Sequence, residues 1–199
     1  MKTLLKKLYQ LLDLTKKVDF LAPLALRLYL VPIFWMAGTK KWGSFDSTVE
    51  WFGNADWGLG LPFPLVLAFL ATWIEILGAI SLLLGIGLRW IAGPLIFTMI
   101  IAMTTVHADY GWQAISDPGG SFSNERVIAS AEKLSAAKSI LKEHGNYSWL
   151  TSSGNIVVLN NGIEFAATYL IMLLSLLFTG AGRFVSVDYW FKRKYIDQN

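Results

Sequence analysis

Polar residues cluster where two apolar stretches of the chain meet their flanking loops. His107 ends one stretch, and Asn160, Asn161 and Glu164 begin another. We predict that His107 and Glu164 pair there, because an imidazole beside a carboxylate can ligate a metal, move a proton or hydrogen-bond a quinone headgroup. Lys40, at the end of a third stretch, lies at comparable depth. The alternative is structural: the two asparagines cap one helix, and His107 caps the end of the other.

A second set of charges lies inside the apolar stretches. Arg27 lies about six residues into the first stretch, and Glu75 lies near the middle of the second. If these stretches are antiparallel helices, the two depths differ by only about 5 Å at a rise of 1.5 Å per residue. We therefore predict an Arg27–Glu75 pair. The pair either fixes how the helices dock, or forms the polar floor of a ligand or quinone cavity with a proton-relay carboxylate.

Two methionines precede His107 at helical spacing. Met99, Met103 and His107 follow one another at i, i+4 and i+8, so an α-helix places them on one face. Thioethers and an imidazole suit Cu(I), which makes these residues a candidate metal site. Methionines at this spacing also occur as ordinary packing residues, and that interpretation stays open. The other histidine, His144, is interpreted as a surface residue at a helix end.

Composition limits the protein to a membrane class. Of 199 residues 54% are hydrophobic, which is more than a water-soluble core of this size can bury. The formal net charge is +3 and the basic residues form no stripe, which argues against nucleic-acid binding. The chain has no cysteine, so it has no disulfide, thiolate metal site or iron–sulfur cluster of its own. A redox role therefore needs a bound cofactor or a partner.

The elements that position these residues are predicted transmembrane helices. Four stretches are long and apolar enough to cross a hydrocarbon core of about 30 Å: residues 21–38, 62–87, 90–107 and 160–181. The joint between the second and third is a tight turn. Residues 1–20 are predicted to form an amphipathic helix at the membrane interface. The fold class is all-α: one membrane domain over residues 1–199, built on a four-helix bundle.

Basic residues determine the expected orientation. Those at both ends of the chain and in the tight turn fall on one face, so the positive-inside rule places both termini in the cytoplasm. The outer segment 41–61 is aromatic-rich and expected to be structured. The longer outer segment, 109–159, is expected in the periplasm. It contains a predicted helix at about 123–144, capped by Ser121 or Ser123 and ended by Gly145, which we interpret as a lid.

Two sequence patterns resemble a known family. They are LALRLYLVPIFWMAGTKKW in the first stretch and ATWIEILGAISLLLGIGLRW in the second. Both are similar to the DoxX family of four-helix bacterial membrane proteins over about residues 21–108, and GIEFAATYLIMLLSLLFTGAGRFVSVDYW resembles its final helix. The insertions WFGNADWGLGLPFP, VHADYGWQAISDP, ILKEHGNYSWL and NNGIEFAATY resemble the HvfX branch of that family.

The resemblance implies a functional context. The HvfX branch is associated with copper-binding, ribosomally made and modified peptides, so it implies an inner-membrane accessory in peptide maturation or handling and in copper or redox stress. The residues carried over are Arg27, Glu75, His107, Asn161 and Glu164. Two alternatives stay open: a quinone-linked oxidoreductase subunit, and a scaffold for soluble maturation enzymes. The expected partners are the lipid bilayer, the peptide or its enzymes, and a second copy in a homo-oligomer; the candidate cofactors are quinone and Cu(I).

Overall fold

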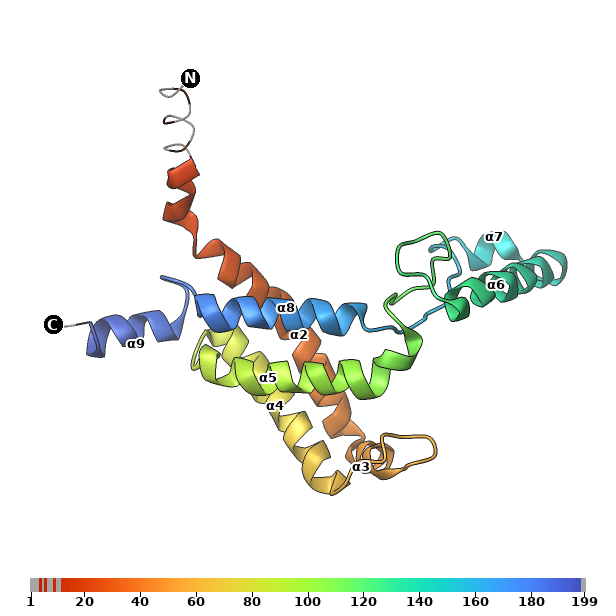
Figure 1. Ribbon diagram of the computed structural model, residues 1–199, viewed down its shortest axis with the longest axis horizontal. Coiled ribbons are helices and arrows are strands. Elements are labelled where there is room, and N and C mark those ends of the chain that lie inside the picture. Colours follow the sequence, from red (N-terminus) through yellow and green to blue (C-terminus); the bar gives the residue numbers. More distant parts are fainter. Residues whose placement is uncertain (1–3, 5, 7–8, 10–11, 198–199) are drawn as a thin grey trace. The chain divides into compact units, whose positions relative to one another are not determined.

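The computed structural model describes residues 4, 6, 9 and 12–197, which form two compact units (Figure 1). Unit 1 contains the described residues of Met1–Thr98 and Tyr169–Asn199, and unit 2 is Met99–Thr168. Regular structure in the described residues is helical, apart from an isolated antiparallel bridge between Ile115 and Leu159. The predicted all-α class is therefore confirmed.

Unit 1 is built around two long helices that lie side by side. Its elements are η1 (Leu14–Val18), α2 (Leu21–Gly43), α3 (Phe45–Gly53), α4 (Pro64–Leu84), most of α5 (Leu88–Ile101), the later part of α8 (Glu164–Thr179) and α9 (Val187–Tyr195). Helix α2 approaches α4 closely at Gly38, where an added Cβ would lie 2.7 Å from Ile76 Cγ1 and 3.1 Å from the backbone oxygen of Thr72. The missing side chain thus lets the two backbones approach.

The connection between α4 and α5 is the tight turn that the sequence predicts. Gly85 caps α4 with a φ of +64°, and Gly87 follows with a φ of +57°. Both values are left-handed, a conformation that glycine adopts without steric cost. Helix α5 then begins at Leu88.

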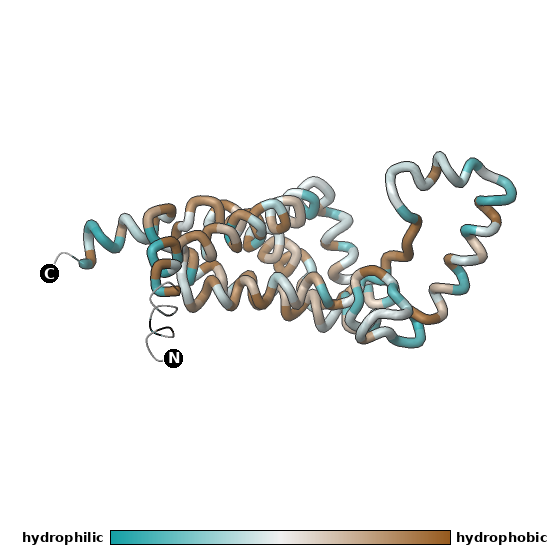
Figure 2. The backbone as a smooth tube through the Cα atoms, turned by 90° about the horizontal axis from the view of Figure 1, so that it is seen from above, coloured by the Kyte–Doolittle hydropathy of each residue, from teal (hydrophilic) through white to brown (hydrophobic). Residues whose placement is uncertain are grey.

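Three helical runs are long and apolar enough to cross a membrane: Leu21–Gly43, Pro64–Leu84 and Leu88–Tyr110. Many of their large apolar side chains are exposed, as at Phe97 and Trp90, which is 88% exposed. Figure 2 shows these helices largely in the brown of hydrophobic residues. Such exposure is costly in water but favourable in hydrocarbon. The fourth predicted span forms the apolar helix α8, which has 16 residues.

Unit 2 contains the end of α5 and the long segment between α5 and α8. Its further elements are η2 (Ala102–His107), η3 (Ala108–Tyr110), α6 (Glu125–His144), α7 (Tyr147–Leu150) and the start of α8. Helix α6 confirms the helix predicted at about 123–144, and Gly145 is its C-cap. The predicted N-cap is wrong: Asn124 caps the helix, and its side-chain oxygen accepts from Val127 N at 2.9 Å. An amide oxygen caps as well as a serine hydroxyl does. A lid role for α6 stays a prediction.

Two other expected segments are described in part. Of the amphipathic helix predicted over residues 1–20, residues 1–3, 5, 7–8 and 10–11 lie outside the described residues; the remainder is helical from Leu12, with η1 as a 3-10 turn. The segment 41–61 is structured as expected. It contains α3, which packs on α4 and buries Phe52.

Candidate functional site

Arg27 is the most extensively bonded polar side chain of unit 1. The residue is 1% exposed, and its guanidinium donates to four backbone oxygens. Nε donates to Leu82 O at 2.7 Å and Nη2 to Leu83 O at 2.9 Å, while Nη1 donates to Ala181 O at 2.7 Å and Val185 O at 3.2 Å. The first two carbonyls belong to the last turn of α4, where carbonyls lack intrahelical partners and a cation is favoured. Arg27 therefore joins α2 to the end of α4 and to the segment after α8.

The predicted Arg27–Glu75 pair is wrong. Glu75 pairs with Lys41, whose Nζ lies 2.8 Å from Oε1 and 2.6 Å from Oε2. The side chain of Glu75 is 7% exposed and that of Lys41 is 25% exposed. A buried carboxylate thus has its counter-ion on the neighbouring helix, as a buried charge requires.

The helix register explains the change of partner. Gly38 lies against Ile76, whereas Arg27 lies against Leu82 in the antiparallel pair of α2 and α4. Glu75 is consequently level with the carboxyl end of α2 and far from Arg27. The sequence estimate failed because it placed Arg27 and Glu75 at similar depths. The close contact at Gly38 fixes a different register of α2 against α4.

A separate aromatic group lies where α2 meets α4. The ring of Trp73 lies 5.4 Å from that of Trp42 and 6.2 Å from that of Phe69, measured between centroids. The indole Nε1 of Trp73 is buried and, among the described residues, has no hydrogen-bond partner. A buried donor without a partner is rare enough in proteins to mark a place where a ligand acceptor would be favourable.

In unit 2, His107 and Glu164 each bond to a backbone group of a loop, and the two side chains do not pair with one another. His107 Nδ1 lies 2.7 Å from the backbone oxygen of Asn161, and Glu164 Oε2 accepts from Ala114 N at 2.8 Å. No ion pair joins the imidazole and the carboxylate, both of which lie in the described residues. The predicted charge pair is therefore wrong, because both side chains form hydrogen bonds with backbone groups of the loops instead. Lys40 is exposed in unit 1, and its place at the cluster stays a prediction.

Asn160 holds the loops of unit 2 together. The residue is 2% exposed, and its Nδ2 donates to Tyr110 O at 2.8 Å and Gln113 O at 2.7 Å. Its Oδ1 accepts from Arg126 Nε at 3.2 Å. These bonds run to the preceding loop and to α6, so the interpretation of Asn160 as a cap of the following helix is also wrong.

The methionine ladder before His107 is interrupted. Residues Ala102–His107 form a π-helix, in which each turn holds an extra residue. Thr105 Oγ1 donates to Ile101 O at 2.7 Å, and this hydroxyl occupies a carbonyl near the start of the π-helix. Met99 precedes this change of period and is 8% exposed, whereas Met103 and His107 lie within the π-helix, so the regular α-helical spacing assumed for the three residues does not hold throughout, and a metal site at them stays a prediction. π-Helical turns often occur at functional sites.

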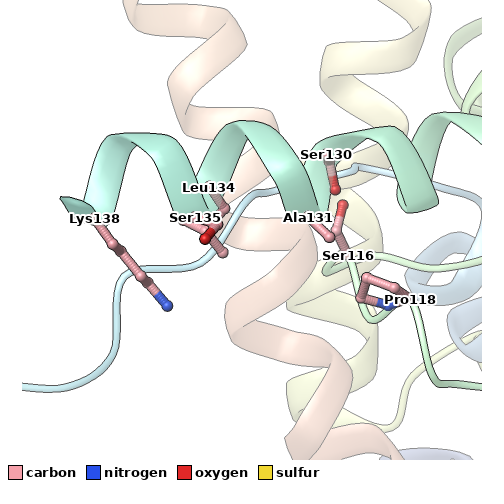
Figure 3. Close-up of a pocket in the computed structure, with 7 residues that line it drawn as sticks. All are labelled: Ser116, Pro118, Ser130, Ala131, Leu134, Ser135 and Lys138. Carbon is pink, nitrogen blue, oxygen red and sulfur yellow. The ribbon is translucent and has the colours of Figure 1, made fainter. Parts of the chain in front are cut away.

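Unit 2 also contains a hollow that the sequence interpretation missed (Figure 3). Its volume is about 260 Å³, and the hydroxyls of Ser116 and Ser130 point toward one another at its wall. Ser116 Oγ is buried without a partner in the described part of the chain. The sequence pattern could have indicated this wall, because the α6 residues that line the hollow recur at helical spacing on one face of the helix. The lining consists of Ser116, Pro118, Ser130, Ala131, Leu134, Ser135 and Lys138.

The region that holds most of these groups has a family match. Residues 22–108 match the DoxX family model. No curated protein and no solved structure matches the chain. The matched region runs from α2 to just past the end of the π-helix, and so it includes Arg27, the Lys41–Glu75 pair and His107. Asn160 and Glu164 lie beyond its end.

We predict that Arg27 is required for the stability of unit 1. Arg27→Ala leaves four backbone acceptors without their donor, and each buried acceptor left unsatisfied costs about 1–3 kcal/mol. The thermal midpoint of the purified protein in mild detergent should fall strongly. Arg89→Ala is the matched control, because exposed Arg89 donates to a single carbonyl, that of Phe178. Equal midpoints for the two variants would contradict a central role for Arg27.

A double-mutant cycle tests the Lys41–Glu75 pair. Either Lys41→Met or Glu75→Leu alone orphans a charge in an apolar bundle, at a cost of roughly 3–5 kcal/mol. The double variant should recover most of that loss, because it removes both charges. The same cycle between Arg27 and Glu75 should be additive. Thermal melts of all variants provide the measurement, and additive losses at Lys41 and Glu75 would show that the pair contributes nothing.

Proposed function

We propose that this protein is a multi-pass accessory of the bacterial inner membrane that takes part in producing or handling a copper-binding modified peptide. The DoxX domain supports the membrane class, and the insertions that resemble the HvfX branch support the peptide context. The functional centre in this proposal is His107 and the loop segments that hold it.

The observation that carries the proposal is the hydrogen bond of His107. A backbone carbonyl can only accept, so Nδ1 must carry a proton in its contact with Asn161 O. In the neutral ring, Nε2 then has the free lone pair. A ring nitrogen fixed by a bond at the other nitrogen is the usual arrangement of histidine ligands and bases.

The donor atoms near His107 favour a soft ion. The described residues contain no group of three or more histidine and carboxylate side chains that could hold a metal, which disfavours a hard-ligand site. Met103 lies with His107 on the π-helix, and a thioether with an imidazole suits Cu(I). When bound, the ion would supply redox chemistry that no cysteine of this chain can provide.

The hollow of unit 2 provides a place for part of a peptide. It combines apolar wall with serine hydroxyls and the ammonium of Lys138, a mixture that accepts a short polar or acidic segment. It lies in the same compact unit as His107. We propose that a peptide handled by this protein contacts that hollow.

The proposal includes α8 as a fourth span. Its 16 residues extend about 24 Å, short of the 30 Å hydrocarbon core, so the flanking residues must cover the remaining depth. Gly180 and Ala181 continue beyond its end and are buried. Four crossings place both termini on one side, and the basic ends then face the cytoplasm.

Single cysteines can test this topology, because the chain has none of its own. We expect Ser135→Cys to react with a membrane-impermeant maleimide in intact spheroplasts, and Ile196→Cys to react only after lysis. Both positions are exposed, so reactivity reports the side of the membrane. Labelling of both from outside would show that α8 does not cross, and labelling of Ile196→Cys alone would reverse the orientation.

His107 should be required for function but not for folding. We expect His107→Ala to lower copper bound by the purified protein, and copper-peptide output in cells, by ~10-fold or more, since losing a ligand costs at least as much as losing its supporting bond. Glu164→Gln should act more weakly, because the amide oxygen still accepts from Ala114 N. The control is His144→Ala in the exposed end of α6. Unchanged copper binding and copper-peptide output of a well-folded His107→Ala variant would contradict the proposal.

One observation favours a quinone-linked oxidoreductase as the second candidate. Among the described residues Nε1 of Trp73 has no hydrogen-bond partner, and this indole, packed on Trp42, is suited to donate to a quinone carbonyl. Lipid extraction and metal analysis of the same preparation separate the candidates. Stoichiometric quinone that Trp73→Phe removes would favour the oxidoreductase, and copper that His107→Ala removes would favour the peptide accessory.

A further inference from the structure

Helix α9 presents an exposed apolar stripe. Val187, Phe191 and Tyr195 recur at i, i+4 and i+8, which aligns them on one face. The rings of Phe191 and Tyr195 are 5.0 Å apart, so the two side chains form a continuous surface. Phe191 is 58% exposed and Tyr195 is 62% exposed. This face therefore needs a cover that the helix bundle of unit 1 does not supply.

The helix is fixed at the end of unit 1 where α4 and α5 join. Asp188 accepts from Gly87 N at 2.7 Å and from Leu88 N at 3.1 Å, and its own N–H donates to Gly85 O at 3.0 Å. Ser186 caps α9 by accepting from Tyr189 N. Because Leu88 begins a membrane-length helix, these bonds hold the start of α9 at the end of a span, and the helix extends beyond that end (Figure 1).

Three consecutive basic residues accompany the stripe. Lys192, Arg193 and Lys194 occupy the last turn, and the α9 carboxylate, Asp188, is already engaged by two amides. Arg193 lies 5.5 Å from the ring of Trp190, which itself is anchored by donation from Nε1 to Phe184 O at 2.8 Å. By helical period Arg193 lies opposite the stripe, whereas Lys194 follows Val187 by seven residues and Phe191 by three and so lies beside it, with Nζ 5.1 Å from the ring of Tyr195. The later part of α9 thus carries cations both opposite the stripe and along its edge.

We propose that α9 binds at the membrane interface, with its stripe against the acyl boundary and its basic side chains bound to anionic phospholipid headgroups. A short helix that combines an exposed aromatic stripe with lysine and arginine at its edge and opposite it is typical of helices that bind an anionic interface. The cations select an anionic surface, and their stems can extend from the apolar boundary to the headgroups. The anchored start of α9, at the end of a span, places it at that depth.

This inference does not depend on copper, quinone or the peptide. It requires only that the apolar runs of unit 1 cross a bilayer. It assigns a lipid-binding role to the carboxyl-terminal helix, which lies outside the DoxX match.

Spin labels on single cysteines test the proposal in the full chain. Phe191→Cys reports the stripe and Lys192→Cys reports the basic side chains of the same turn. Both are reconstituted in nanodiscs of phosphatidylcholine alone or with phosphatidylglycerol. With phosphatidylglycerol, we expect the label at 191 to collide mainly with oxygen, and the label at 192 mainly with a water-soluble nickel complex. The ratio of docked to undocked helix should fall about fivefold for each basic residue changed to glutamine, from ~1 kcal/mol per cation.

Three outcomes would overturn the proposal. A label at 191 that is accessible to nickel in phosphatidylglycerol discs would show that the stripe is in water. Equal docking in discs with and without phosphatidylglycerol would show that anionic lipid does not bind α9. Docking of the Lys192→Gln/Arg193→Gln/Lys194→Gln variant equal to that of the unchanged protein would show the same. Spin–spin broadening between labels at 191 would show that a second copy covers the stripe. Thermal melts of each variant confirm that the anchored segment remains folded.

Discussion

A guanidinium inside an apolar bundle must have its N–H groups satisfied by protein, because hydrocarbon offers no acceptor. Arg27 meets this requirement with backbone oxygens from the end of α4 and from the segment that follows α8. Residues more than 150 positions apart in the sequence are thereby fixed to one side chain. The turn between α4 and α5 and the start of α9 depend on this arrangement, since Asp188 links them immediately beside it.

The close approach of α4 to α2 is a second constraint with distant effects. Only a residue without a side chain at position 38 lets α2 contact the backbone of α4 at Ile76. That contact sets the register of the two helices, and the register decides that Glu75 meets Lys41. The Lys41–Glu75 ion pair is therefore a consequence of backbone packing.

Several polar side chains of unit 2 order its loops. Asn160 and Glu164 bond to backbone groups of the segment around residues 110–114. In His107 one ring nitrogen is held by Asn161 O, and the described residues provide no hydrogen-bond partner for the other. The π-turn that ends at His107 needs support from side chains, and the threonine hydroxyls near its start provide it. Structural and chemical roles thus fall on neighbouring residues of the same loops.

The sequence by itself determined the helical class, the three long apolar runs, the glycine turn after α4 and the helix at about 123–144. These features follow from local composition, period and capping, so no distant contact is needed to infer them. The cap at Asn124 shows the limit of such local inference, because Ser121, Ser123 and Asn124 could each cap the helix and the sequence does not select among them. Helix offset, the break in helical period and the partners of Arg27, Glu75, His107 and Glu164 came only from the tertiary structure. The physical reason is that backbone carbonyls and amides, which sequence patterns do not reveal, bond to Arg27, His107 and Glu164. For Glu75, the close contact at Gly38 sets the register of α2 and α4 and thereby brings Lys41 within reach.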